Sequence, residues 1–136
     1  MTPYLLVAAG GAFGSIGRYW MAGSLDARLN AALPQLMFPT GTLLVNVLGS
    51  FVIGALAGME EEVTRWGLPN DARLLLMVGF CGGFTTFSSF SLQTLGLLRE
   101  GLLLRAGGNV ALSVLLCLIA TWAGIALMHA LGRPVS

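Results

Sequence analysis

The chain has 136 residues, of which 56% are hydrophobic and only 10% are charged, and its mean hydropathy is +0.84. Since about a quarter of the residues of a globular domain are charged, this composition excludes an ordinary water-soluble fold and predicts a protein of the lipid bilayer. The net charge of +1, without any cluster of Lys and Arg, argues against binding to nucleic acid.

Apolar segments separated by polar or turn-forming residues predict an all-α membrane protein with four transmembrane helices in a single domain. The spans are expected at about residues 3–23, 40–59, 72–98 and 108–131. The first is expected to be retained, because it has neither a basic leader nor an obvious cleavage site. Asp26 lies in the polar linker of residues 25–38 that is expected to follow it.

Arginine residues are divided almost equally between the two sides of the membrane. One side would carry Arg65, Arg73 and Arg133, and the other Arg18, Arg28, Arg99 and Arg105. Since the positive-inside rule needs an asymmetry to fix an orientation, the chain is expected to insert both ways.

Small or polar residues recur at every fourth position of three spans, which places them on one face of each helix. They are Gly10, Gly14 and Arg18 in the first span, Thr42, Asn46, Ser50, Gly54 and Gly58 in the second, and Asn109, Ser113, Cys117 and Thr121 in the fourth. Close helix packing explains the glycines and Ser50. For the polar face of the fourth span two explanations stay open: close helix packing and the lining of an ion pathway. Asn46 indicates a functional site, because a carboxamide at mid-membrane must find partners.

The third span is interrupted by glycine and hydroxyl residues at positions 79–91. Paired glycines weaken a helix, so two half-helices with a non-helical centre are predicted. A broken backbone is tolerated at membrane depth only where protein or a water-filled cavity satisfies its polar groups, which makes the break a candidate binding or conduction site. Phe87 and Phe90 share one side of the second half-helix, among hydroxyl groups.

The predicted spans contain no Asp or Glu, so they offer neither a proton-coupled carboxylate nor a ring of negative charge for cations. The amide of Asn46, the Ser and Thr hydroxyls and the positive ring edges of Phe favour a small anion instead.

Three ordered motifs resemble those of the Fluc fluoride channels, also called the CrcB family. They are GGAFGSIGRY at residues 10–19, GTLLVNVLGS at residues 41–50 and GFCGGFTTFSSF at residues 79–90. The resemblance implies a homodimer whose two chains insert in opposite orientations and enclose two fluoride pores. It also implies a structural sodium ion, not transported, held at the dimer centre by the backbone carbonyls of Gly82 and Thr85.

The resemblance assigns roles to further residues. Asn46 matches the pore asparagine, Phe87 and Phe90 match the paired pore phenylalanines, and Thr42, Ser88 and Ser113 match the polar lining. Arg18 matches a first-span arginine that either draws anions to the vestibule or has the structural role of holding the dimer together. Asn109 stands where the family commonly has tyrosine.

The expected function is passive, fluoride-selective export across the cell (inner) membrane, which lowers the cytoplasmic fluoride concentration. The alternatives are a four-helix transporter like the small multidrug exporters and a non-transporting subunit for membrane assembly. An enzyme is not expected, because His129 has no Cys or carboxylate partner in a membrane-embedded constellation.

Overall fold

The computed structural model describes residues 1–32, 38–60 and 67–132, and all the regular structure in these ranges is helical. The elements are α1 (Thr2–Ala32), α2 (Thr40–Glu60), α3 (Asn70–Arg73), the π-helix η1 (Leu74–Cys81), α4 (Gly82–Phe84), α5 (Phe87–Arg99) and α6 (Leu103–Gly132). The all-α prediction is therefore confirmed. Arg65 and Arg133, which entered the argument about orientation, lie outside the described residues.

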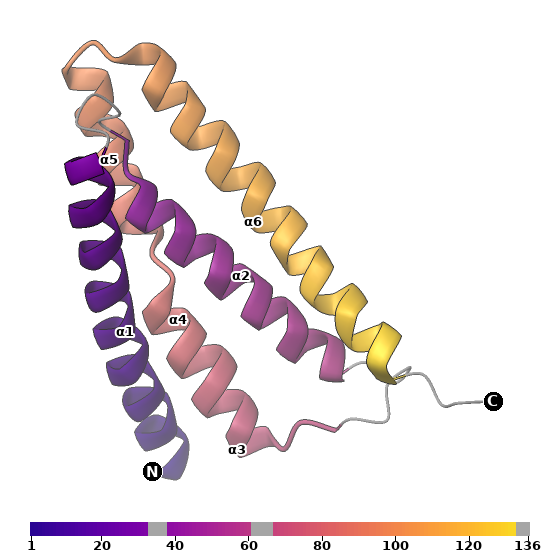
Figure 1. Cartoon of the computed structure of the whole chain (residues 1–136). Coiled ribbons are helices and arrows are strands. Elements are labelled where there is room, and N and C mark those ends of the chain that lie inside the picture. The colour runs from indigo at the N-terminus through magenta and orange to yellow at the C-terminus, as the bar shows by residue number, and fades with distance from the viewer. Residues whose placement is uncertain (33–37, 61–66, 133–136) are drawn as a thin grey trace.

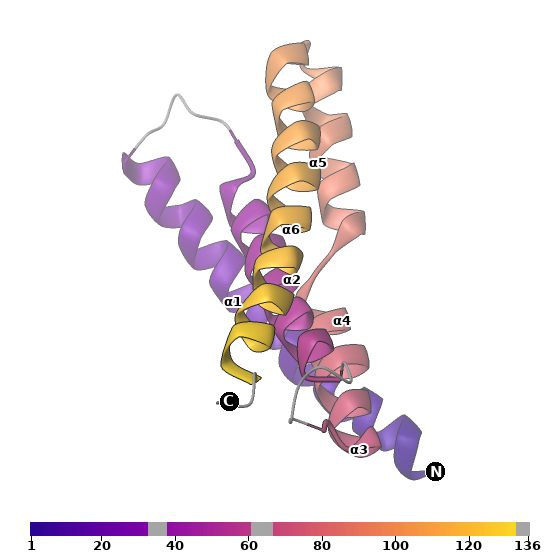
Figure 2. The same cartoon turned by 90° about the vertical axis from the view of Figure 1, so that its right-hand side faces the viewer.

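Three helical segments of the described chain are long and apolar enough to cross a membrane: Thr40–Glu60, Asn70–Arg99 taken as one, and Leu103–Gly132. They correspond to the second, third and fourth predicted spans. The 31-residue α1 is long but too polar to be one of the three. Its start and the end of α6 lie toward the same end of the molecule (Figures 1 and 2).

The first helix is longer than predicted. The expected linker from residue 25 is wrong as far as Ala32, because α1 continues through Asp26 without interruption. Between residues 25 and 32 the sequence has no Gly or Pro that would end a helix, and Pro34 is the first such residue. Asp26 consequently has a fixed position on α1.

Two helix pairs make up most of the packing: α2 lies along α6, and α1 lies along η1 and α4 (Figure 1). Glycines determine how closely they approach. A Cβ atom at Gly54 or Gly124 would collide with the backbone of the opposite helix, and one at Gly10 or Gly14 would collide with the backbone of η1. The contact faces predicted at Gly10, Gly14 and Gly54 are confirmed, whereas the contact at Gly124 was not predicted.

A short turn joins α5 to α6. Gly101 has a φ of 74°, its N–H donates to the carbonyl of Leu98 at 3.1 Å, and the N–H of Leu102 donates to the carbonyl of Leu97 at 2.9 Å. These bonds form a Schellman motif, in which glycine takes the left-handed position that other residues avoid. The turn reverses the chain so that α6 runs back beside α5 and α2 (Figure 2).

The close contact of α2 with α6 gives a first prediction. Gly54→Ala should destabilise the protein by about 1–3 kcal/mol, because the added methyl group meets the backbone of Thr121, which cannot move aside. Gly107→Ala in α6 is the matched control, since nothing lies within 4 Å of its added carbon. Melting temperatures in detergent measure both variants. Equal melting temperatures would contradict the requirement for glycine at position 54.

Candidate functional site at the helix break

The third apolar segment is broken at two residues. Thr85 (φ −82°, ψ 155°) and Thr86 (φ −150°, ψ 112°) are extended, whereas α4 ends at Phe84 and α5 begins at Phe87. The predicted pair of half-helices is thus confirmed. The expected cause is wrong, because Gly82 is helical and Gly83 packs within α4 against Gly11. The chain unwinds at threonines, whose branched side chains favour extended backbone.

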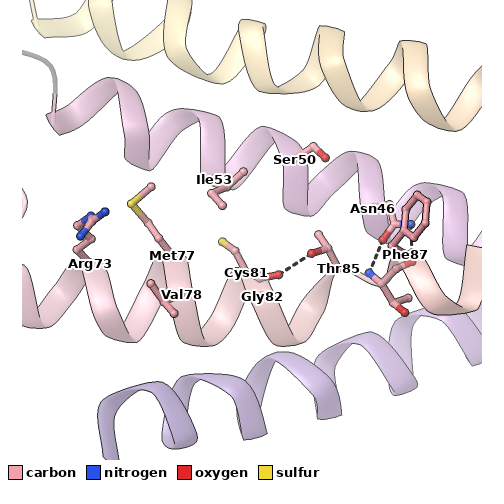
Figure 3. A pocket seen from close by; sticks show the side chains of 11 residues that line it. Asn46, Ser50, Ile53, Arg73, Met77, Val78, Cys81, Gly82, Thr85 and Phe87 are labelled. Atoms are coloured by element: carbon pink, nitrogen blue, oxygen red, sulfur yellow. Dashed lines mark hydrogen bonds between the residues drawn. The ribbon is translucent and has the colours of Figure 1, made fainter. Parts of the chain in front are cut away.

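Asn46 of α2 holds the extended segment in place (Figure 3). Its Nδ2 donates to the carbonyl of Thr86 at 3.1 Å, and the N–H of Thr86 donates to its Oδ1 at 2.8 Å. One side-chain amide therefore satisfies both backbone groups of the residue at which the helix is broken. We call this arrangement the Asn46–Thr86 clamp.

The clamp and the N-cap of α5 give two N–H groups side-chain partners in place of helical carbonyls. In a continuous helix the N–H of Thr86 would bond to the carbonyl of Gly82, but it bonds to Asn46 instead. The N–H of Ser89 would likewise bond to the carbonyl of Thr85, but it bonds to Thr86 Oγ1 at 3.2 Å. The carbonyls of Gly82 and Thr85 thereby lose their regular helical donors. They are the same pair that the resemblance associates with sodium.

Arg18 of α1 bonds to the neighbouring carbonyl. Its Nε donates to Gly83 at 3.2 Å, and Ser15 Oγ donates to the same oxygen at 3.5 Å. A cation at the C-terminal end of a helix stabilises carbonyls that have no helical partner. This contact is made within one chain, and both roles open for Arg18 stay predictions.

Two cavities border the break. The larger, of about 530 Å³, is lined by Asn46, Ser50, Ile53, Arg73, Met77, Val78, Cys81, Gly82, Thr85, Thr86 and Phe87 (Figure 3). The smaller, of about 220 Å³, is lined by Arg18, Tyr19, Ala22, Gly23, Asp26, Thr42, Thr86, Ser89 and Gln93. Thr86 borders both, so it lies between the two cavities.

The predicted site residues thus fall into groups. Asn46, Gly82, Thr85 and Phe87 share the larger cavity, and Arg18 and Thr42 share the smaller. The rings of Phe87 and Phe90 have centroids 5.2 Å apart at an interplanar angle of 50°. The hydroxyl of Ser88 lies 3.1 Å from that of Thr86. Their roles in conduction stay predictions.

The polar stripe of α6 is partly buried in the chain itself. Asn109 and Ser113 are 2% and 8% exposed. Asn109 Nδ2 donates to Thr94 Oγ1 at 2.8 Å, and Thr94 Oγ1 donates to the carbonyl of Phe90 at 2.7 Å. Asn109 therefore supports the backbone of Phe90 through Thr94, while Ser113 borders neither of the two cavities.

Sequence patterns indicated no role for Thr86, Thr94 or Asp26. Thr86 had a local signal, because threonine is a preferred N-cap residue. Its side chain accepts the N–H of Ser89, three residues later, as a helix N-cap does. The partners of Thr94 and Asp26 lie on other helices, 15 residues away along the chain in each case. Local patterns do not indicate such contacts.

The clamp gives a second prediction. Asn46→Leu removes the acceptor of the Thr86 N–H, which should cost about 1–3 kcal/mol and speed hydrogen exchange at that amide. Ser50→Ala, one turn further along α2 and beside the same cavity, is the control and should leave the exchange unchanged. Hydrogen exchange in detergent or nanodiscs measures both. Unchanged protection of Thr86 in the Asn46 variant would contradict the clamp.

Comparison with known proteins identifies the family. The family described as CrcB-like protein, Camphor Resistance (CrcB), matches residues 5–125. Proteins named fluoride-specific ion channel FluC are similar to this chain over most of their length. The protein of Methylocella silvestris is 48% identical over 121 residues, which are 89% of this chain and 88% of that protein. The protein of Rhodospirillum rubrum is 52% identical over 121 residues, which are 89% of this chain and 90% of that protein. The corresponding protein of Opitutus terrae is 49% identical over 124 residues (91% and 90%). The chain is therefore a multi-pass membrane protein that belongs to the CrcB family.

Proposed function

We propose that this protein is a fluoride-selective ion channel through which fluoride leaves the cell passively, so that its cytoplasmic concentration falls. One observation carries the proposal: the chain belongs to a family whose relatives, 48–52% identical over about nine-tenths of the chain, are named fluoride-specific ion channels. Those names describe channels rather than enzymes. The chemistry of the site is in keeping with them.

Hydrogen-bond donors around the break suit a small anion. One N–H of Asn46 is bound to the carbonyl of Thr86, and its second N–H is available to a ligand. The ring edges of Phe87 and Phe90 carry partial positive charge. We assign these residues, with Thr42, Ser88 and Ser113, to the fluoride pathway.

A multidrug exporter that exchanges protons for cations is less well supported. Such a transporter needs a carboxylate within the membrane. Among the described residues that line the larger cavity there is no Asp or Glu, and its cation Arg73 pairs with Glu60 at 3.2 Å. Asp26, which borders the smaller cavity, is bonded to the start of α2. No contact among residues 1–32, 38–60 and 67–132 favours the assembly-subunit alternative.

The working unit that we propose is a homodimer of oppositely inserted chains. In the single chain Gly82 and Ser88 are exposed, and Phe87 is 78% exposed, although all three adjoin a broken backbone in an apolar segment. Irregular backbone at membrane depth has to be covered by protein or water. A second copy would cover this face.

A structural sodium ion between the two chains fits the residues at the break. Hard cations take oxygen ligands, and the carbonyls of Gly82 and Thr85 have lost their regular helical donors. Among the described residues no group of three or more His, Cys, Asp or Glu could hold a metal. Backbone oxygens are therefore the ligands that we assign, and the ion would join two broken helices without being transported.

Ion flux tests the proposed function. Purified protein in liposomes should pass fluoride at least about a hundredfold faster than chloride, since pore donors that discriminate between ligands do so by a few kcal/mol. A fluoride electrode and a chloride electrode measure the two effluxes from the same vesicles. Equal rates, or no flux above that of protein-free liposomes, would contradict the proposal.

The same assay tests the two rings. Phe87→Ile and Phe90→Ile should lower fluoride flux while the protein keeps its oligomeric state on size-exclusion chromatography. Leu95→Ile, one and a half turns beyond Phe90 on α5 and exposed, is the matched control. Wild-type flux in both Phe variants would contradict a role of the rings in conduction and leave them a packing role.

Sodium removal tests the proposed ion and dimer together. When potassium replaces sodium on both sides of the vesicle, fluoride flux should fall and the dimer should dissociate faster in detergent, because four carbonyls would meet without a cation between them. Flux and cross-linking yield are measured in parallel. Unchanged flux and unchanged dimer lifetime in sodium-free buffer would contradict the assignment.

A further inference from the structure

Asp26 lies on α1 and binds the first turn of α2. Its Oδ1 accepts the N–H of Gly41 at 2.8 Å and the hydroxyl of Thr40 at 3.4 Å. The first turn of α2 has no acidic residue of its own. Asp26 thus acts as a helix N-cap supplied by another helix, where a carboxylate offsets the partial positive charge of the unpaired N–H groups.

The contact also fixes the position of α2. A Cβ atom at Gly41 would lie 2.5 Å from the carbonyl of Ala22 and 2.9 Å from the carboxylate of Asp26, so α2 begins in direct contact with α1. The next residue is Thr42, which is 6% exposed and borders the smaller cavity. By holding Gly41, Asp26 also positions the Thr42 hydroxyl.

Asp26 and Arg18 both border this cavity, eight residues apart on α1 and therefore on nearly the same face. The cavity thus has one charge of each sign on a single helix. It also adjoins Gln93, whose buried Oε1 has no hydrogen-bond partner among the described residues. About 220 Å³ bordered by such groups suits several water molecules and hence a hydrated ion.

We propose that Asp26 controls how readily fluoride reaches the helix break: it positions the start of α2, and its negative charge opposes the attraction of Arg18 and the α2 N-terminus for anions. The proposal rests on the function proposed above. At low fluoride concentration the entry of the anion limits flux, and a carboxylate beside an arginine and a helix N-terminus lowers the local concentration of anions. Asp26 would keep the cavity close to neutral.

The test separates the charge from the cap. Asp26→Asn removes the charge but keeps an oxygen that accepts the Gly41 N–H, so at about 10 mM ionic strength and low fluoride its flux should exceed that of wild type about two- to fivefold. The excess should disappear near 1 M salt, where the screening length falls to about 3 Å. Asp26→Ala also loses the cap and should melt at a lower temperature than Asp26→Asn.

Asp71→Asn is the matched control, because Asp71 is an exposed carboxylate on α3 that borders neither cavity. Its flux should equal that of wild type at both salt concentrations. Wild-type flux in Asp26→Asn at low salt, or an equal rise in Asp71→Asn, would overturn the electrostatic role. Equal melting temperatures of the Asp26 variants would overturn the positioning role. A wild-type protein without fluoride flux would instead contradict the proposed function, and is recognised before any variant is compared.

Discussion

The arrangement of this protein depends on one constraint: a helix that breaks within an apolar segment must still satisfy its backbone hydrogen-bonding groups. Asn46 satisfies both groups of Thr86, Arg18 satisfies the carbonyl of Gly83, and the hydroxyl of Thr86 satisfies the N–H of Ser89. These side chains come from α2, from α1 and from the break itself. The break is therefore a hydrogen-bonded junction of four helices: α1, α2, α4 and α5.

Close packing makes these bonds possible. Arg18 reaches Gly83 because α1 lies directly against η1 and α4, where Gly10, Gly14 and Gly83 leave room for backbone contact. Gly79 and Gly83 of the interrupted segment thus serve helix approach, whereas a Cβ atom at Gly82 would meet nothing within 4 Å. The same residue type has two uses in membrane helices, and composition alone does not distinguish between them.

Sequence patterns predicted the helices and the existence of a break, because length, hydropathy and turn residues are local properties. They did not predict which residues unwind, since the choice of Thr86 depends on Asn46, 40 residues earlier in the chain. The contact of Arg18 with Gly83 spans 65 residues. Asp26 was assigned to a polar linker because charged residues are typical of loops. It lies instead on α1, and its carboxylate binds the start of α2.

The bonds that stabilise the break also limit what an anion can bind. Ser91 Oγ donates to the carbonyl of Phe87 at 2.9 Å and Thr94 Oγ1 to that of Phe90 at 2.7 Å, so neither hydroxyl hydrogen is available to an ion. Asn46 likewise uses one of its two N–H hydrogens on Thr86. In the proposed channel fluoride would meet the few donors that the structure does not already use, together with ring edges. Such a site binds weakly at any one point, and weak successive contacts are what allow an ion to move on.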